Sequence, residues 1–287
     1  MIDIIIPTYN RAKFLVETLK SVQSQTFHQW QCWIAEDGQT QETLKAITPF
    51  LKDKRFKYLP GEHAGRPSKP RNRAIREGIA KYIAFLDDDD IWLPDKLQLQ
   101  IEFMERHPGC VLLGCNAYRW SGSEEWNSST PLYFQKRKFS GHIPYDLFVQ
   151  ENYIILSSAM IRRVALERSG LFNESLLISE DYELWLRIGA LGEIWNISDP
   201  LLLYRDAGPT YYPKYNRQEN YKTRASILLS ALEGVDNIPS PLSYPENRNY
   251  AAACDCEKKF YLAGPCFLGR LRHELMLKIK RCLNRPL

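Results

Sequence analysis

Short continuous apolar runs alternate along this chain with longer segments in which apolar residues recur every three or four positions. Four apolar runs, each the length of one buried strand, lie at residues 2–6, 31–35, 56–59 and 82–86. Between these runs, apolar positions three and four residues apart predict helices at residues 11–25, 40–51 and 72–80. Strand and helix in alternation predict a parallel sheet and an α/β fold.

The pattern continues less regularly to residue 205 and changes after it. Further elements are expected as helices at 97–107 and 181–191 and as strands at 111–117, 153–161 and 194–204. Aromatic side chains mix with Ser, Gly and Glu in residues 118–138, which is typical of a hairpin or an exposed substrate loop. A mobile flap is expected at 206–220, followed by helices at 221–232, 249–262 and 267–283. We therefore expect a domain at residues 1–205 and a flap with a helical extension at 206–287.

The composition is that of an ordinary globular protein, and it narrows the class of function. Of 287 residues, 44% are hydrophobic and 25% are charged, and the net charge of +4 gives no case for nucleic-acid binding. No apolar run reaches the roughly 18 residues of a membrane span, and the first residues have the pattern of a strand, not of a secretion signal. The seven cysteines show no zinc-binding spacing. We therefore expect a protein of the reducing cytoplasm.

The run at residues 82–86 leads directly into four consecutive carboxylates, Asp87 to Asp90. Adjacent like charges repel and are costly to bury unpaired, so these side chains are either solvated or neutralised by a cation. Ligands of open α/β sheets bind beyond the carboxyl ends of strands, and hard divalent cations prefer carboxylates and phosphates. The position after a buried strand therefore favours a metal–diphosphate site over a solvated turn.

Six segments resemble, in the same order, the motifs of family-2 glycosyltransferases, and they lie at residues 4–11, 24–27, 36–38, 70–75, 85–94 and 179–187. Most of them lie where a strand is expected to end or a helix to begin. The resemblance covers residues 1–205 and implies a GT-A fold, a Rossmann-like α/β architecture with a mostly parallel central sheet flanked by helices. It divides the domain into a nucleotide-sugar half at about 1–117 and an acceptor half at about 118–205.

The resemblance also implies a nucleotide-sugar donor and favours a UDP-sugar. It assigns donor binding to Pro7, Thr8, Tyr9, Arg11, Asp37, Arg71, Asp87 and Asp88. Tyr9 offers a ring face to the nucleoside, and Asp37 can accept a hydrogen bond from an imide N–H such as that of uracil. The alternative for Asp37 is a simple turn residue before Gly38.

Metal and phosphate contacts follow from the same resemblance. Asp89, together with Asp87, would be the direct ligand of Mn²⁺ or Mg²⁺, and the cation would stabilise charge on the leaving diphosphate. The loop before the acidic strand carries three cations, Arg66, Lys69 and Arg71. They either neutralise the diphosphate or form a solvated basic loop.

The segment at 179–187 carries the expected general base. Asp181 would take the proton of the acceptor hydroxyl during direct displacement with inversion, and the start of a helix favours its ionised form. The alternative is a helix N-terminal carboxylate with no chemical role. Glu180 would accept a hydrogen bond from the acceptor sugar. Many family members carry a His shortly after the last strand, whereas here Asp206 follows Arg205 and is a candidate substitute.

The resulting hypothesis is a metal-dependent inverting glycosyltransferase whose acceptor is a hydroxyl of a glycan or a lipid-linked molecule. The Gln-x-x-Arg-Trp motif of processive synthases is absent, which favours a single transfer. The alternative is a non-catalytic nucleotide- or glycan-binding member of the same fold. The helix expected at 267–283 has an apolar stripe between basic residues. It would lie on the inner face of a membrane, or it would dock on its own domain or on a second subunit.

Overall fold

The computed structural model describes residues 1–122, 126–127, 129–134, 140–149, 151–176 and 178–206. The flap expected beyond residue 206 and the helices expected at 221–232, 249–262 and 267–283 lie outside these residues. Within the described part of the chain, no helix is both long and apolar enough to cross a membrane.

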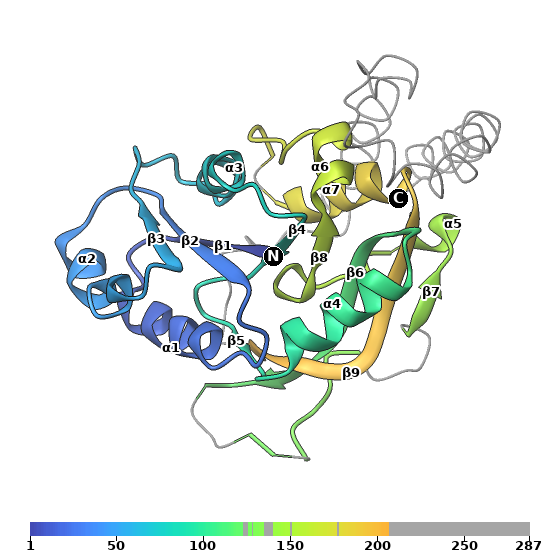
Figure 1. Ribbon diagram of the computed structural model, residues 1–287, viewed down its shortest axis with the longest axis horizontal. Helices are drawn as coiled ribbons and strands as arrows, with labels where there is room; N and C mark the ends of the chain where they lie inside the picture. The colour runs from blue at the N-terminus through green and yellow to red at the C-terminus, as the bar shows by residue number, and fades with distance from the viewer. Residues whose placement is uncertain (123–125, 128, 135–139, 150, 177, 207–287) are drawn as a thin grey trace, which may run out of the picture.

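Four parallel strands form the N-terminal half of the sheet, in the order β3-β2-β1-β4 (Figure 1). They are β1 (Ile2–Thr8), β2 (Trp30–Glu36), β3 (Phe56–Leu59) and β4 (Tyr82–Phe85). The segments between them form α1 (Ala12–Gln23), α2 (Gln41–Ile47), a 3-10 turn (Phe50–Lys52) and α3 (Ser68–Glu77). Every residue of β1 and β4 is buried, as expected for strands covered on both faces. This half has the alternation that the sequence predicts.

The other half of the sheet continues in the order β8-β6-β9-β5 and mixes strand directions. Its strands are β5 (Ile91–Trp92), β6 (Cys110–Trp120), β7 (Gly141–Ile143), β8 (Met160–Arg162) and β9 (Glu193–Arg205). β8 is antiparallel to β4 and β6, whereas β9 is parallel to β6 and antiparallel to β5 and β7. The helices of this half are α4 (Lys96–Arg106), α5 (Tyr145–Phe148), α6 (Arg163–Ser169) and α7 (Glu180–Gly189).

Helices cover both faces of the sheet, and each face has its own apolar core. Figure 1 shows α1, α2 and α4 on one side of the strands and α3, α6 and α7 on the other. Successive side chains of a strand point to opposite faces. Ile4 and Ile6 therefore pack with Leu15 in one core, while Ile5 belongs with Trp185 to the other. The two cores fix β1 and β4 between helices and so fix the position of whatever follows these strands.

The strand expected at residues 153–161 is wrong over most of its length. Residues 153–155 lie in no strand, Leu156–Ser158 form a 3-10 turn, and only Met160–Arg162 pair as β8. Residues 153–156 are nevertheless buried, and their side chains are shared between the two cores. A buried apolar run has no periodicity that distinguishes a strand from other buried backbone, which explains the error.

Candidate active site

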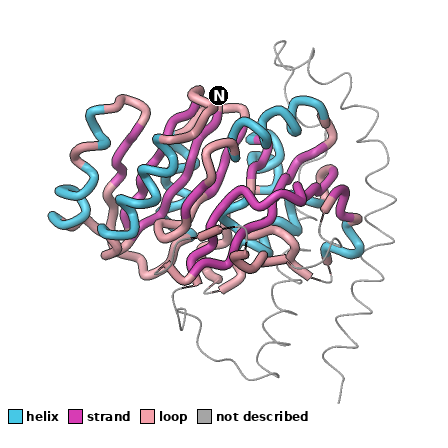
Figure 2. Tube along the Cα trace, turned by 90° about the horizontal axis from the view of Figure 1, so that it is seen from below, coloured by secondary structure: helices cyan, strands magenta, loops and turns pink. Residues whose placement is uncertain are grey.

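The polar segments that follow β1, β2 and β4 meet at one edge of the sheet. These strands are parallel and in register, with Ile5 opposite both Trp33 and Phe85. Their carboxyl ends therefore lie together, at the edge opposite the N-terminus, where loops gather (Figure 2). Thr8, Asp37 and Asp87 to Asp90 all come from this edge. The structure thus brings together residues that the sequence analysis assigned to the donor and to the metal.

The acidic turn at residues 87–90 is tied to the end of β1. The Thr8 hydroxyl donates to Asp88 Oδ2 at 2.7 Å. Arg11 Nη1 lies 2.7 Å from Asp89 Oδ2 and 3.3 Å from Asp88 Oδ1. Asp88 is buried, whereas Arg11 is half exposed at the surface of the turn. Asp88 thus contacts two other residues predicted to bind the donor, and one of them, Arg11, also contacts the predicted metal ligand Asp89.

The neighbouring guanidinium groups do not fully offset the burial and mutual repulsion of the carboxylates in the turn. Burial raises the pKa of Asp88 to about 7, the Asp89 charge adds to the rise, and the Thr8 hydrogen bond opposes it. Burial and the Asp87 charge raise the pKa of Asp89, although Arg11 counteracts them. Burial, followed by the charges of Asp89 and Asp87, raises the pKa of Asp90 well above its usual range. An additional cation would relieve this repulsion.

Asp90 differs from its neighbours because it anchors the last strand. The main-chain N–H of Arg205 donates to Asp90 Oδ1 at 2.9 Å, and the Thr18 hydroxyl donates to the Asp90 carbonyl at 2.8 Å. The Arg205 side chain donates to the Asp89 carbonyl at 2.7 Å and pairs with Glu17 at 2.5 Å. Asp90 therefore holds the turn against β9 and α1, and no local sequence signal distinguishes it from the other three aspartates.

The turn fits a hard divalent cation by its chemistry and its exposure. Asp87 and Asp89 keep 34% and 24% of their side chains exposed, while Asp88 keeps only 8%. Among the described residues, no three His, Cys, Asp or Glu side chains form a closed metal site. Mg²⁺ and similar ions are commonly held by one or two carboxylates together with substrate phosphates. Asp87 and Asp89 are thus the side chains that could hold such an ion.

Arg71 joins the acidic turn to the start of α7. Its Nη2 atom lies 2.7 Å from Asp87 Oδ1 and its Nη1 atom lies 2.7 Å from Glu180 Oε1, and the residue is 3% exposed. The guanidinium predicted to face a diphosphate is therefore engaged by two carboxylates in this structure. Arg66 also reaches across, donating to the carbonyls of Glu174 and Ser175 at 2.8 and 2.9 Å. Lys69 is exposed.

Asp181 lies in the first turn of α7, two residues after a strained residue. Ser179 has φ of 55°, in the left-handed region that non-glycine residues seldom adopt. Burial raises the pKa of Asp181 above the usual aspartate range, and the adjacent Glu180 charge adds to this, while the Tyr182 main chain and Arg71 oppose it. Asn152 Nδ2 lies 3.4 Å from Asp181 Oδ2. A carboxylate with a raised pKa is suited to accept a proton.

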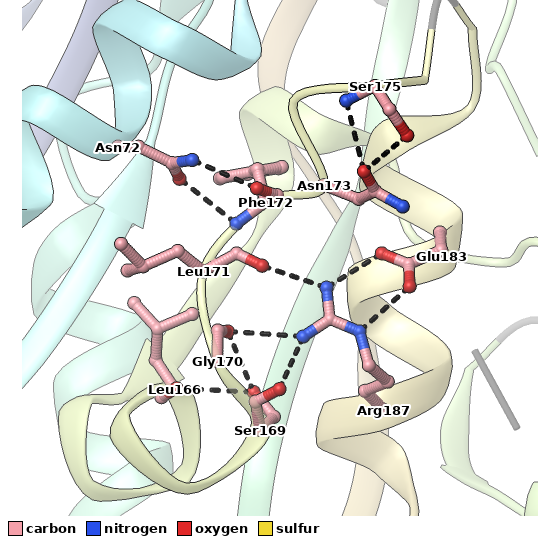
Figure 3. A network of polar contacts seen from close by, with 10 residues as sticks. All are labelled: Asn72, Leu166, Ser169, Gly170, Leu171, Phe172, Asn173, Ser175, Glu183 and Arg187. Atoms are coloured by element: carbon pink, nitrogen blue, oxygen red, sulfur yellow. Dashed lines mark hydrogen bonds and ion pairs between the residues drawn. The ribbon is translucent and has the colours of Figure 1, made fainter. Parts of the chain in front are cut away.

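The segment between α6 and α7, which leads to Asp181, is braced from two sides (Figure 3). From α3, Asn72 Nδ2 donates to the Phe172 carbonyl at 2.9 Å, and Asn72 Oδ1 accepts from the Phe172 N–H at 3.0 Å. From α7, Arg187 pairs with Glu183 at 2.7 Å and donates to the carbonyls of Ser169, Gly170 and Leu171. The Glu183–Arg187 pair has the i,i+4 spacing of a helix, which a sequence can show. The contacts of Asn72 and of Arg187 with the segment between α6 and α7 join positions 16 to 100 apart and have no such pattern.

The expected nucleoside side of the site contains a residue that the sequence analysis missed. Tyr9 is 44% exposed and stacks on His63, with ring centroids 4.2 Å apart and an interplanar angle of 15°. Asp37 is buried, and its carboxylate accepts from the main-chain N–H groups of Ala64 and Gly65 at 2.7 and 2.8 Å. His63 Nδ1 lies 3.0 Å from Asp37 Oδ2. A single histidine in a polar loop carries no pattern that would have indicated this role.

Two further residues singled out from the sequence, Pro7 and Asp206, lie within or at the end of strands. Pro7 is buried within β1, opposite Ala35 of β2. Asp206, the candidate substitute for a histidine, pairs with Arg119 at 2.5 Å, and its N–H donates to the Trp120 carbonyl at 2.7 Å. Both carboxylate and guanidinium are about half exposed. Asp206 therefore extends the β6–β9 pairing at its end.

The fold and the sequence of this protein are similar to those of known glycosyltransferases. Residues 1–349 of Staphylococcus aureus TarS, in complex with UDP-GlcNAc, have a TM-score of 0.64 at 17% identity, and the match covers 98% of this chain and 88% of that fragment. The mannosyltransferase PcManGT of Pyrobaculum calidifontis, in complex with GDP-Man and Mn²⁺, has a TM-score of 0.54 at 16% identity, covering 100% and 76%. These similarities show a GT-A fold, as predicted.

Relatives by sequence are closer. An uncharacterized glycosyltransferase of Rickettsia conorii is 32% identical over 209 residues, which cover 73% of this chain and 33% of the relative. The match thus spans about a third of the length of that rickettsial protein. The Escherichia coli UDP-Glc:α-D-GlcNAc-diphosphoundecaprenol β-1,3-glucosyltransferase WfgD is 29% identical over 188 residues, covering 66% of this chain and 69% of WfgD. The family model described as glycosyl transferase family 2 matches residues 3–170. The chain belongs to glycosyl transferase family 2.

Proposed function

We propose that this protein is a metal-dependent inverting glycosyltransferase, which moves a sugar from a nucleotide-sugar donor to a hydroxyl of a glycan or a lipid-linked acceptor. One buried side chain supports this proposal most strongly. Arg71 contacts Asp87 and Glu180 at 2.7 Å each, so the carboxylates expected to serve the donor and those expected to serve the acceptor lie within reach of a single guanidinium. Leaving group and attacking hydroxyl must meet at one carbon, and this arrangement meets that requirement.

The donor would lie across the carboxyl ends of β1, β2 and β4. Tyr9 would stack on the base, Asp37 would accept its N–H, and the diphosphate would face the acidic turn. Uracil offers one imide N–H that a carboxylate can accept, and thymine offers the same group. WfgD is named for a UDP-Glc donor, and the TarS fragment was solved in complex with UDP-GlcNAc. Both similarities support a UDP-sugar as the donor of this protein. PcManGT with GDP-Man makes GDP the second nucleotide to test.

Asp89 and Asp87 would hold Mn²⁺ or Mg²⁺ on the donor side. A cation bound there would stabilise the negative charge that develops on the leaving diphosphate. The chain's own contribution is to fix the two carboxylates. Arg11 contacts Asp89 and Arg71 contacts Asp87, each at 2.7 Å, so neither side chain is free to turn away.

Asp181 would act as the general base. The acceptor oxygen forms a bond to the anomeric carbon, the bond from that carbon to the diphosphate breaks, and the hydroxyl proton moves to the Asp181 carboxylate. The raised pKa of Asp181, caused mainly by burial, brings its proton affinity closer to that required of a base. The carboxylate of Glu180 is held by Arg71, which leaves Asp181 as the base of this pair.

This proposal assigns donor binding and acceptor binding to different parts of the chain. Residues 1–117 would bind the donor and residues 118–205 the acceptor, and a transfer would add one sugar per encounter in the cytoplasm or at the inner face of a membrane. The acceptor named for WfgD is lipid-linked, which supports an acceptor of that class. The roles suggested for the helices of the extension at 206–287 remain predictions from the sequence, since they concern residues beyond 206, which the structure does not describe.

Calorimetric titration with UDP, GDP and dTDP, and with CDP and ADP as contrasts, tests the donor site. We expect one nucleotide to bind in the presence of Mn²⁺, and CDP and ADP to bind more weakly because each presents an acceptor nitrogen to Asp37. Asp89→Ala should abolish the manganese-dependent part of the binding. Asp199→Ala, an exposed aspartate outside the site, is the matched control and should leave it unchanged. Absence of binding by all the nucleotides would refute the assignment.

A further inference from the structure

The loop at residues 61–66, between β3 and α3, crosses the edge where the donor is expected to bind. It is fastened at both ends. The Gly61 N–H donates to the Gly38 carbonyl at 3.0 Å, and Arg66 donates to the carbonyl of Glu174 at 2.8 Å. Between these anchors, residues 62, 63 and 65 are exposed. Gly65 has φ of 70°, a conformation that suits glycine, so the backbone is shaped to turn its N–H groups inward.

His63, at the tip of this loop, occupies one face of Tyr9. The two rings are nearly parallel, at 15°, with centroids 4.2 Å apart. A flat ring lying on an exposed tyrosine is the contact that a nucleobase would make there. His63 keeps 49% of its side chain exposed, so little other packing holds it in place.

The same loop occupies the carboxylate of Asp37. In the described part of the chain, every hydrogen bond of residues 63–65 ends on Asp37. Ala64 donates to one carboxylate oxygen and Gly65 to the other, and His63 Nδ1 lies 3.0 Å from the second. These are N–H donors at a buried acceptor, as the imide of uracil or thymine, or the N1–H and N2–H groups of guanine, would be.

We propose that residues 63–65 are a built-in occupant of the nucleobase subsite and that an entering base must displace them. The loop presents a flat ring to Tyr9 and N–H groups to Asp37, the two features that the base itself is expected to present. The inference rests on the proposed function, since it assumes that Tyr9 and Asp37 receive a base. Binding exchanges the chain's own ring and donors for those of the nucleotide.

This exchange selects among bases. A buried carboxylate left without a donor is costly, so an entering base must replace the N–H groups that withdraw. Uracil, thymine and guanine can do so through ring N–H groups. Cytosine and adenine have an unprotonated ring nitrogen beside their amino group. This nitrogen is a hydrogen-bond acceptor and would face the Asp37 carboxylate, which is also an acceptor. Withdrawal of the loop disturbs little else, because its tip is exposed and the hydrogen bonds of residues 63–65 all end on Asp37.

Titration of His63→Ala with UDP, GDP and dTDP, each with Mn²⁺, tests the competition. Loss of one stacked ring should tighten binding of the accepted nucleotide about three- to tenfold. His28→Ala, a change at an exposed histidine of another loop, should leave affinity unchanged. Weaker or unchanged binding by His63→Ala would overturn the inference while leaving the proposed function intact. Failure of the unmodified protein to bind any of the three would instead count against the proposed function.

Proton NMR gives a second measurement that does not depend on affinity. Stacking on Tyr9 should shift the imidazole C–H signals of His63 upfield in the free protein, and these signals are identified by their loss in His63→Ala. Saturation with the accepted nucleotide and Mg²⁺ should move them toward the positions of an exposed histidine. Unchanged His63 signals in a nucleotide-saturated sample would overturn the inference.

Discussion

The acidic turn at residues 87–90 and the start of α7 both place neighbouring carboxylates at the end of an element, yet they are neutralised differently. In the turn, guanidinium groups are in direct contact with Asp87, Asp88 and Asp89. At α7, Arg71 pairs with Glu180, and Asp181 has no guanidinium contact among the described residues. Its polar side-chain neighbour is the Asn152 amide, at 3.4 Å.

This difference suits the two groups of acidic side chains to different roles, one to hold a cation and the other to accept a proton. Carboxylates clamped by arginines keep their positions and carry concentrated negative charge, which suits them to hold a cation. A carboxylate whose pKa is raised by burial and which lacks a guanidinium partner can accept and release a proton. Arg71 contacts both groups and keeps the two tasks close together. The following changes would break or sharpen this distinction.

Asp181→Asn should have the largest effect, because an amide cannot take the acceptor proton. We expect transfer to fall by about a hundredfold to ten-thousandfold, with nucleotide affinity unchanged. Steady-state release of nucleoside diphosphate in the presence of acceptor measures the first quantity, and calorimetry measures the second. Asp199→Asn is the matched control. A fully active Asp181→Asn enzyme would remove the distinction between the two acidic groups.

Arg71→Met should destabilise the protein, since it leaves Asp87 and Glu180 facing each other without their shared cation. Breaking a buried ion pair by removing one partner costs about 3 kcal/mol of unfolding free energy. Urea denaturation measures this loss, and Arg76→Met, at an exposed arginine of the same helix, should change stability little. Equal stability of the two variants would show that Arg71 does not join the two groups in solution.

The pH dependence of transfer should reveal the raised pKa of Asp181. The base must be ionised, so the rate falls as the pH drops through that pKa, and burial places the pKa above the usual aspartate range. Because the positive charge of Arg71 lowers the pKa of Asp181, Arg71→Met should move the acid limb of the rate profile to higher pH. An acid limb at ordinary aspartate pH, or one that Arg71→Met leaves in place, would contradict the electrostatic account.

Asp206→Asn should have the smallest effect. Its partner Arg119 and its own carboxylate are 52% and 42% exposed, and exposed ion pairs contribute less than about 1 kcal/mol. We expect little change in unfolding free energy and in Mn²⁺-dependent nucleotide binding. A clear loss of that binding in Asp206→Asn would instead assign Asp206 to the metal site, in the role of the absent histidine.

The parts of the fold that were predictable from the sequence are those with local signals. Buried apolar runs located β1, β2, β3 and β4, and the parallel order of these strands places the carboxylates after β4 at the same edge of the sheet as Thr8 and Asp37. The direction of β8 had no such signal, because an isolated three-residue strand takes its direction from the strands it joins. The contacts of Arg71 were also hidden, since its partners lie 16 and 109 positions away.

His63 illustrates the remaining gap between sequence and site. Its stacking on Tyr9 depends on how a loop of several residues folds over two strand ends, and its Asp37 contacts are shared with main-chain N–H groups. Main-chain donors exist at nearly every residue, so the sequence does not show which of them are used. Residue types identify which side chains could take part in the chemistry, whereas the hydrogen-bond partners of each side chain are seen only in the folded structure.

Release of nucleoside diphosphate from a panel of UDP-, GDP- and dTDP-sugars, with and without Mn²⁺, tests the central claim most directly. We predict that the protein releases the diphosphate from one of these donors and that release requires a divalent cation. Asp181→Asn should slow the release at least about a hundredfold without preventing nucleotide binding. Nucleotide binding without turnover of any donor sugar, in the presence of glycan and lipid-linked acceptors, would contradict the account and identify a non-catalytic member of the family.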